Sequence, residues 1–469
     1  MSKIKYVCRI EFEITSPLSI GSGENQVTDK DIVQDSRGVP YIPGTSLAGI
    51  YRSLFDGKTA NAYFGKELTK EDIRNTNGRV RLTESEVVTY DACMIDPASV
   101  YRVTKRDMVA LDEYKTAIDG AKFDFQILEP GVRFVTYIEQ NIDCEKKKYV
   151  LREIIDAWMK EKIQIGSKTG RGYGHTKGIS YKTAWFDLGQ EEDLQKWLDF
   201  NMYDEGDKNW GDTDKPVCLS HLTPSNDEYQ KISVHYETHM ISLKAEEQCN
   251  IVLKLQQQGG ISIRQYSTEV GEADYQQLTI SDGSKEGMPV IPGTSWAGAF
   301  RAQMGKLDPA FRKEQETAEM FFGAKKSKDK ENRKSCIRFS ESRIEGGKWV
   351  TYTRNAIDRF TGGTVDGALY TEKTYYNGNT ELCIDCDFSG IGQESRNHFA
   401  SVMAAAIMDL HGGYMAVGGL TAVGRGIFKI TEIWIDGKRY LPEEYEMPKL
   451  YQGLAGAIAG KGGDINGVK

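Results

Sequence analysis

Two stretches of the chain alternate apolar and polar residues with a period of two. Residues 5–14 read KYVCRIEFEI, and residues 249–256 read CNIVLKLQ. Because successive side chains of a strand point to opposite faces of its sheet, each stretch predicts a β-strand. A third pattern, EEDLQKWLDF at 191–200, has helical spacing and predicts a short helix.

Each predicted strand is followed by nearly the same phrase. The sequence YIPGTSLAGIYRSLF at 41–55 returns as VIPGTSWAGAFRAQM at 290–304. The Pro-Gly pair predicts a turn, and the Thr-Ser pair offers an N-cap, so we expect helices to begin near Ser46 and Ser295. The apolar residues at helical spacing in the first copy predict its buried stripe: Leu47, Ile50, Tyr51 and Leu54.

This phrase belongs to a longer internal repeat, which predicts two modules of one fold. We expect the modules at 1–200 and 231–445, joined by an acidic linker at 201–230 and followed by a glycine-rich, flexible tail at 446–469. The other matching blocks are Ala62–Gly65 with Met320–Gly323, Val80–Ser85 with Ile337–Ser342, Ala117–Phe123 with Thr364–Tyr370, and Ile165–Gly174 with Val417–Gly426.

Composition restricts the class of protein only moderately. The 469 residues contain 39% hydrophobic and 27% charged residues, with neither a long apolar run nor an apolar signal core, which predicts a cytoplasmic protein with no membrane span. The net charge of −8 gives no sign of nucleic-acid binding, so any such binding must come from a local basic surface or from backbone donors. Cys383 and Cys386 form a C-x-x-C pair without a second pair, and reduced thiols are favoured over a zinc site.

Two features of the repeat indicate an anion-binding surface. The N–H groups at a helix N-terminus bind anions, and Arg52 and Arg301 follow one turn later in the two predicted helices. Gly49 and Gly298 each cost about 1 kcal/mol inside a helix, which suggests close approach by another backbone or by a ligand. The competing interpretation is that the serines only cap and the arginines are only solvated.

The glycine-rich block IGSKTGRGYGH at 165–175 matches neither a phosphate-binding P-loop nor a dinucleotide fingerprint. Its glycines suit a backbone that approaches another group closely, and Lys168, Arg171 and Arg425 place positive charge beside the two loops. A plain glycine-rich hairpin crossing a sheet is the alternative. The segments 100–125 and 353–382 have polar loops between aromatic strands, and predict long projecting hairpins.

In this order, the motifs resemble those of the RAMP superfamily. The resemblance rests on the glycine-rich entry PLSIGSG at 17–23, the two PGTS phrases, the AIDGAKF and TVDGALY blocks and the two glycine loops. More narrowly, the chain resembles type III CRISPR backbone subunits, and its two fused modules resemble those of the III-D and III-E variants. The resemblance implies an α+β fold of two tandem ferredoxin-like (RRM-like) modules with inserted β-hairpin thumbs.

The resemblance further implies a ribonucleoprotein of antiviral defence. Its expected partners are a CRISPR guide RNA, a target single-stranded RNA and other type III effector subunits, and each module would hold one repeating step of the guide. RNA would be recognised by shape and backbone, with sequence left to base pairing. The RNA-binding residues that it implies are Ser46, Arg52, Gly166, Lys168, Arg171, Ser295, Arg301, Gly418, Gly419 and Arg425.

Family members that cut target RNA carry an aspartate ahead of PGTS, and Asp29, ahead of Asp35, stands at the matching place. The resemblance implies that Asp29 is catalytic and binds Mg²⁺, since one carboxylate can hold a divalent ion at a scissile phosphate. Asp29 lies six residues before Asp35, and the second module departs from this pattern, because the residue six positions before Asp282 is Gln276. Asp274 lies nearby and is the predicted second catalytic residue.

Three other functions are compatible with the sequence. The first is a guide-processing endoribonuclease of the same superfamily, for which His175 is the candidate general base. The second is a structural backbone subunit that binds guide and target without cutting, and only Asp29 separates this from the cleaving subunit. The third, a protein unrelated to RNA, is consistent with the net charge of −8.

Overall fold

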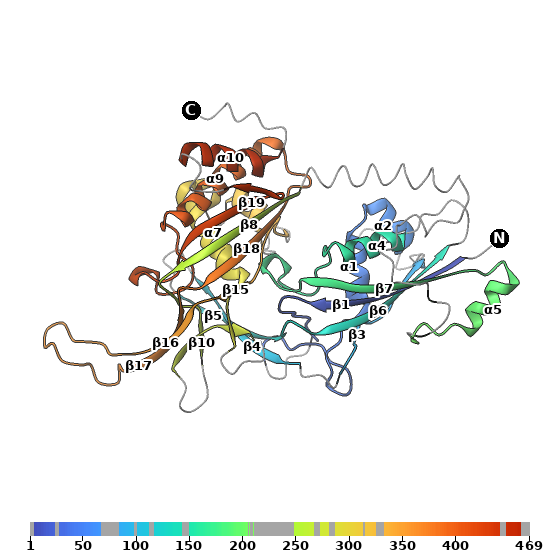
Figure 1. The fold of residues 1–469 in the computed structure, drawn as a ribbon, viewed down its shortest axis with the longest axis horizontal. Helices are drawn as coiled ribbons and strands as arrows, with labels where there is room; N and C mark the ends of the chain where they lie inside the picture. The colour runs from blue at the N-terminus through green and yellow to red at the C-terminus, as the bar shows by residue number, and fades with distance from the viewer. Residues whose placement is uncertain are drawn as a thin grey trace, which may run out of the picture. The chain divides into compact units, whose positions relative to one another are not determined.

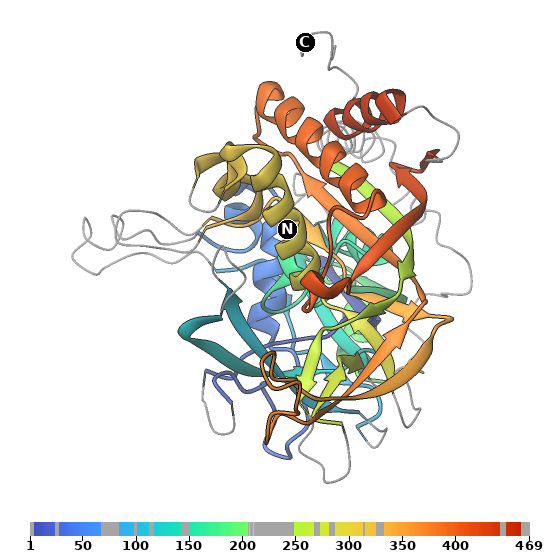
Figure 2. The same cartoon turned by 90° about the vertical axis from the view of Figure 1, so that its left-hand side faces the viewer.

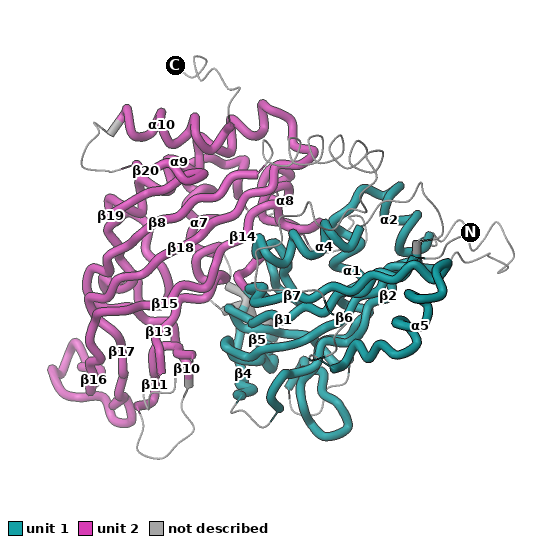
Figure 3. Tube along the Cα trace, turned by 45° about the vertical axis from the view of Figure 1, so that its right-hand side comes forward, with its two compact units in different colours: residues 1–169, 173–224 teal, residues 170–172, 225–469 magenta. Residues whose placement is uncertain are grey.

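The computed structural model divides into two units. Unit 1 comprises residues 1–169 and 173–224, and unit 2 comprises residues 170–172 and 225–469 (Figure 3). The structure describes residues 4–23, 28–66, 84–97, 101–111, 117–142, 150–204, 206, 210, 248–266, 273–280, 287–312, 315–324, 333–440 and 447–460.

Unit 1 is built on an antiparallel sheet with the strand order β2-β6-β1-β7, and these four strands are labelled in Figure 3. Strand β3 also pairs with β6 (Figure 1). Apart from α2, β3, the inserted strands β4 and β5, and α5, the elements follow along the chain as strand, helix, two strands, helix and strand, which is the ferredoxin-like order that we predicted. Its elements are β1 (Ile4–Ile14), α1 (Gly44–Ser53), α2 (Gly57–Tyr63), β2 (Val87–Thr89), β3 (Cys93–Met94), β4 (Val103–Leu111), β5 (Ala117–Leu128), β6 (Arg133–Ile142), α4 (Val150–Met159), β7 (Thr176–Asp187) and α5 (Glu191–Asp199).

Both faces of this sheet are covered. On the first face, Phe12 of β1 packs against Trp158 of α4 with ring centroids 4.3 Å apart, and the Trp158 indole N–H donates to the Tyr51 hydroxyl at 3.1 Å. On the second face, Phe186 of β7 packs against Trp197 of the predicted helix α5. Trp210, inside the predicted linker 201–230, is buried in the same cluster. Most of that linker, residues 211–230, lies outside the described residues.

Unit 2 repeats the arrangement in a larger sheet with the order β12-β13-β15-β18-β8-β19-β20, in which β14 also pairs with β18. The strands β14-β18-β8-β19 within it repeat the strand order of unit 1. Its elements are β8 (Gln248–Gln258), β9 (Gly260–Ile261), β10 (Arg264–Tyr266), β11 (Tyr275–Gln277), β12 (Thr279–Ile280), β13 (Met288–Ile291), α7 (Gly293–Leu307), α8 (Glu316–Phe322), β14 (Ile337–Phe339), β15 (Ser342–Glu345), β16 (Lys348–Arg354), β17 (Tyr370–Tyr376), β18 (Asn379–Asp387), α9 (Gln393–His411), β19 (Ile427–Ile435), β20 (Lys438–Tyr440) and α10 (Met447–Ala459).

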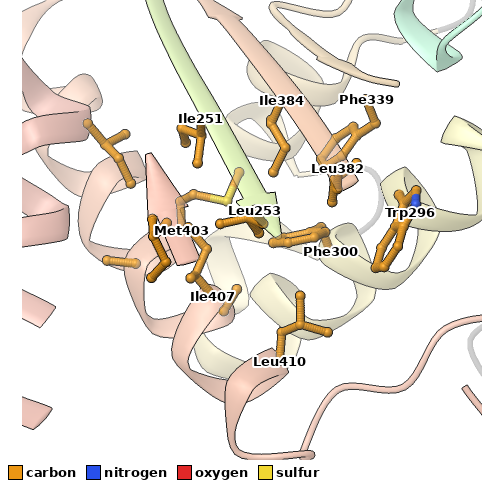
Figure 4. Packing of buried hydrophobic residues seen from close by; sticks show 14 of the residues in the cluster. Ile251, Leu253, Trp296, Phe300, Phe339, Leu382, Ile384, Met403, Ile407 and Leu410 are labelled. Carbon is orange, nitrogen blue, oxygen red and sulfur yellow. The ribbon is translucent and has the colours of Figure 1, made fainter. Parts of the chain in front are cut away.

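The core of unit 2 lies between the helices and one face of the sheet. Figure 4 shows Ile251 and Leu253 of β8 packed against Phe300 of α7 and Met403 of α9. Helix α10 then packs along α9 (Figure 2). The predicted flexible tail is therefore wrong for residues 447–459, because apolar side chains at helical spacing bury this segment: Leu450, Leu454 and Ile458.

The inserted hairpins are present in both units. In unit 1, β4 pairs with β5 between β3 and β6 in the chain, and in unit 2, β16 pairs with β17 between β15 and β18. One block of the repeat was matched wrongly. Ile337–Phe339 pairs with β18 in unit 2, and Val87–Thr89 pairs with β6 in unit 1. Because β18 and β6 are equivalent strands, Val87–Thr89 is the counterpart of Ile337–Phe339. The match to Val80–Ser85 rested on similar residue types alone, and residues 80–83 of that segment lie outside the described residues.

Candidate functional site

The two PGTS helices begin earlier than the serine caps predicted. Helices α1 and α7 start at Gly44 and Gly293, each with the preceding proline at the N-cap and no side-chain cap bond. Ser46 and Ser295 lie in the first turn, where their N–H groups donate to the carbonyl oxygens of these prolines at 2.9 Å. In α1, the Gly44 N–H instead donates to the Asp91 carboxylate at 2.6 Å. The cap prediction is wrong, because proline fixes the backbone and a distant carboxylate accepts the bond.

The two helix arginines pack inside their own units. Arg52 donates to the carbonyl oxygens of Gly65 at 2.6 Å and Ala60 at 3.3 Å, and so joins α1 to α2. Arg301 lies 5.8 Å from the ring centroid of Phe322, and burial lowers the pKa of its guanidinium. The geometry assigns these side chains to helix packing, and leaves their predicted contacts with RNA without direct support.

The faces of α1 and α7 that carry Gly49 and Gly298 are open. A Cβ atom built on either glycine meets nothing within 4 Å, and both residues are exposed. No backbone from the described residues therefore explains these two glycines. They remain compatible with close approach of a ligand, as the sequence predicted.

The two glycine loops adopt left-handed backbone conformations at equivalent positions. A Cβ on Gly166 would lie 2.5 Å from the carbonyl oxygen of Ser19, and one on Gly418 would lie 2.7 Å from that of Ser262. The Gly419 N–H donates to the same Ser262 oxygen at 2.7 Å. Packing within each unit thus already requires glycine at positions 166 and 418. Positive φ angles recur at Gly166, Lys168, Gly172 and Gly174 and at Gly418, Leu420, Gly424 and Gly426.

The three cations beside these loops have different environments. The Lys168 ammonium lies 3.0 Å from the centroid of the Phe125 ring. The Arg425 guanidinium bonds to the Glu372 carboxylate at 3.0 Å, and both side chains are buried. Arg171 is exposed. Of the three, Arg171 is the one whose position suits a contact with a phosphate in solution.

Sequence reasoning missed a second role of the loops, which is to anchor the inserted hairpins. Tyr173 and Arg425 occupy the same place in the repeat. Tyr173 packs on Phe125 of β5 with ring centroids 5.9 Å apart and accepts a bond from Arg106 of β4 at 3.2 Å. Arg425 bonds instead to Glu372 of β17. The signal was the Tyr-to-Arg difference inside otherwise matching loops.

The aspartate ahead of each PGTS phrase is tied to the hairpin of its own unit. In unit 1, the Asp29 N–H donates to the Asp124 carboxylate, and the Asp124 N–H donates to the Asp29 carboxylate, both at 2.9 Å. In unit 2, the Thr371 N–H donates to the Asp274 carboxylate at 2.7 Å, and the Thr371 hydroxyl lies 3.0 Å from both the Asp274 carboxylate and its N–H.

Asp274 is therefore the structural counterpart of Asp29. Asp124 and Thr371 directly follow the matching blocks of the repeat, so both aspartates bind the same position of the second hairpin strand. The Val33 N–H donates to Ile20 and the Leu278 N–H donates to Ile263, each four residues after its aspartate, so the longer spacing of unit 2 arises after Leu278. Gln276 lies within β11 and pairs with Gln265 of β10, while Asp282 lies outside the described residues. The cleaving role of both aspartates stays a prediction.

The two carboxylates differ in their surroundings. A hydrogen bond from Lys105 lowers the pKa of Asp124, the partner of Asp29. The bonds from the Thr371 N–H and hydroxyl lower the pKa of Asp274 itself. Asp29 and Asp274 are both exposed, so each can reach a ligand.

The residues present suit a magnesium ion only with RNA as co-ligand. Within the ranges that the structure describes, no three His, Cys, Asp or Glu side chains gather closely enough to hold a metal. Mg²⁺ commonly uses one or two carboxylates, with water and substrate phosphates as its other ligands, and exposed Asp29 fits that mode. Cys383 and Cys386 are three positions apart in strand β18 and so point to opposite faces, which excludes a shared metal ion.

His175, the candidate general base of the alternative nuclease, lies at the end of the first glycine loop. Its ring is 3.1 Å from the side-chain amide of Gln164, and its backbone N–H donates to the Ser16 hydroxyl at 2.8 Å. These neighbours hold the residue in the loop.

Comparison with known proteins places the chain in a family. The model of the RAMP superfamily matches residues 11–177 and 270–429, and so covers parts of both units. No curated protein matches the chain. The chain is similar to a protein in the cryo-EM structure of the Type III-B Cmr-beta bound to cognate target RNA, with 17% identity and a TM-score of 0.29; the match covers 38% of this chain and 60% of that one. Among the described residues, no helix is long and apolar enough to cross a membrane. Because the family model matches more than half of the chain, and does so in two separate regions, the protein is a member of the RAMP superfamily.

Proposed function

We propose that this chain is a guide-RNA-binding backbone subunit of a type III CRISPR effector complex, and that it cleaves target RNA in a metal-dependent way. The observation that carries the proposal is the duplication itself. Both regions that match the RAMP model contain an aspartate bound at the same position of an inserted hairpin, Asp29 in one and Asp274 in the other. The fused modules suit a III-D-like or III-E-like subunit that works in the cytoplasm.

The RNA would be held mainly through its phosphates. The open faces marked by Gly49 and Gly298, together with exposed Arg171, offer close approach and positive charge. Such contacts carry no base information, so guide sequence would not affect affinity. With one module per repeating step, the chain would protect two steps of the guide. Other effector subunits would continue the assembly at both ends.

Cleavage would depend on the position of one carboxylate per module. Asp29 is exposed, and its link to Asp124 fixes it relative to the hairpin of unit 1. We place it beside the sugar of a target nucleotide splayed out of the helix, where the 2′-oxygen can line up with the phosphorus and the leaving 5′-oxygen. A Mg²⁺ ion bound there would stabilise charge developing on the phosphate.

The test is Asp29→Asn in the assembled complex, with target cleavage mapped at nucleotide resolution. Asparagine keeps the shape and removes the charge, so one defined cut should disappear while guide and target binding stay within about twofold, because the side chain is exposed and its hydrogen bond to the Asp124 N–H can be kept by the asparagine oxygen. EDTA should abolish the cuts of both modules, and Asp274→Ala should remove only the second cut.

Asp35→Asn is the matched control, because it makes the same change in the same loop. The Asp35 oxygen accepts bonds from the Arg37 and Val39 N–H groups at 2.8 and 3.0 Å, and the asparagine oxygen can keep both. This variant should cut like wild type. Cleavage is refuted if Asp29→Asn leaves every cut unchanged; a complex that binds target and never cuts it identifies a structural subunit instead.

A further inference from the structure

Each candidate aspartate is joined to one residue of its hairpin by hydrogen bonds in both directions. In unit 1, Asp29 and Asp124 exchange two bonds, from the N–H of each to the carboxylate of the other. In unit 2, Asp274 and Thr371 are joined in the same two directions. The residues of each pair are 95 and 97 positions apart along the chain, so no local turn produces the contact. The same link occurs twice with different side chains.

The two directions of the link depend on different groups. One is the N–H of residue 124 or 371, which donates to the aspartate carboxylate and survives any side-chain replacement except proline. The other is the side chain of that residue, which binds the N–H of the aspartate. Removing the side chain should therefore loosen the aspartate without detaching it.

We propose that Asp124 and Thr371 are positioning residues, which set the place of the catalytic carboxylates Asp29 and Asp274 by fastening their loops to the hairpins. The proposal rests on the cleavage proposed above. Positioning matters because a displacement of about 1 Å can cost roughly 100-fold in rate. The loss of one of two holding bonds should cost less, about 10-fold.

The two positioning residues act differently on the carboxylate. Thr371 also donates its hydroxyl to the Asp274 carboxylate, at 3.0 Å, so it orients the acid as well as the loop. Asp124 brings a second negative charge, which Lys105 of β4 balances through an ion pair. The module with Asp124 should hence depend on Lys105, and the module with Thr371 should depend on its hydroxyl.

Matched variants in the assembled complex separate these roles. Asp124→Asn keeps an oxygen that accepts the Asp29 N–H, whereas Asp124→Ala removes it. Thr371→Ser keeps the hydroxyl, whereas Thr371→Val removes it and preserves the shape. Single-turnover rates at the two cuts serve as mutual controls, since each substitution lies in one hairpin.

We expect Asp124→Ala to slow the Asp29 cut about 10-fold and Thr371→Val to slow the Asp274 cut about 10-fold. The other cut should be unchanged in each case, target affinity should stay constant, and the conservative variants should recover at least half of the loss on a logarithmic scale. Amide hydrogen exchange without Mg²⁺ gives a second measurement, in which Asp124→Ala should speed exchange in 28–35 and Thr371→Val in 273–280.

The outcomes are distinguishable from those of the cleavage proposal. If Asp29→Asn abolishes its cut while Asp124→Ala cuts at the wild-type rate, the positioning role is wrong and cleavage stands. If Asp29→Asn leaves all cuts unchanged, cleavage fails, and exchange in 28–35 still decides whether Asp124 fixes the loop. Unchanged exchange in both alanine and valine variants would overturn the proposal.

Discussion

The buried ion pair between Arg425 and Glu372 allows a stability prediction with an internal template. In unit 2 the two side chains are 4% and 3% exposed and 3.0 Å apart. Arg425 also donates to the Thr374 hydroxyl at 3.1 Å. In unit 1 the equivalent residues are Tyr173, Phe125 and Ile127, which form an apolar cluster. The same connection between loop and hairpin is thus made once by an ion pair and once by apolar packing with a hydrogen bond from Arg106 to the Tyr173 hydroxyl.

Removal of one charge should destabilise the hairpin of unit 2 strongly. Truncating one partner of a buried pair costs about 3–5 kcal/mol, because the remaining charge is left without water or a partner. Glu372 retains Arg354 at 3.8 Å, a side chain that is 39% exposed, so we expect Arg425→Ala to cost near the lower limit, about 3 kcal/mol. Arg354→Ala should cost at most about 1 kcal/mol, since partly exposed pairs contribute little.

Replacing the charged and polar residues of unit 2 with their apolar equivalents from unit 1 should cancel this loss of stability. The triple variant Arg425→Tyr, Glu372→Phe and Thr374→Ile removes both charges together, and such replacements are neutral or stabilising by about 1–4 kcal/mol. Amide hydrogen exchange at β17 measures the local free energy of opening, which suits a chain of two units that need not unfold together. The reasoning is refuted if the triple variant is as unstable as Arg425→Ala, or if Arg354→Ala costs more than Arg425→Ala.

Four further outcomes are expected. Arg52→Ala should lower the free energy of unfolding of unit 1 by more than it lowers the free energy of RNA binding, because the Arg52 guanidinium bridges two helices. Calorimetry measures the first quantity and filter binding the second. Asp91→Asn should cost about 0.3–1 kcal/mol by weakening the bond to the Gly44 N–H, and should tighten RNA binding at low salt. The bond from His398 lowers the pKa of Asp308, so the stability that this ionised carboxylate contributes is complete above its unfolded pKa of about 4 and is lost as the pH falls below that value. Between pH 5 and 3, the melting temperature of the Asp308→Asn variant should therefore fall by less than that of the wild type. Nuclease footprints on the guide should lengthen by two repeating steps per bound chain, and one step would show that one module lacks an RNA face.

Local patterns were sufficient for the core of the fold. The period-two stretches became β1 and β8, and Leu47 and Tyr51 are buried at the predicted spacing in α1. Both hairpins and the short helix α5 were also predicted correctly. The strands β1 and β8 and the helix α1 follow from spacing within a few residues, since one face of each must be buried.

The wrong predictions have non-local causes. The cap of α1 is not Ser46, because Asp91 supplies the acceptor from far along the chain. Spacing alone could not align Asp274 with Asp29, because the segment between the aspartate and the helix is longer in unit 2 than in unit 1. Nor could charge alone separate Arg52, which binds helix carbonyls, from exposed Arg171.

The two modules hold their inserted hairpins at equivalent places through different side chains. The second hairpin strand is held at two places, by the aspartate loop at Asp124 or Thr371 and by the glycine loop through Tyr173 or Arg425. At both places the side-chain chemistry differs between the modules, while the positions that are joined are equivalent in the repeat. A shared geometry reached through different contacts indicates that the position of the hairpin relative to the aspartate is the property in common, and that is the property that cleavage of a splayed nucleotide would require.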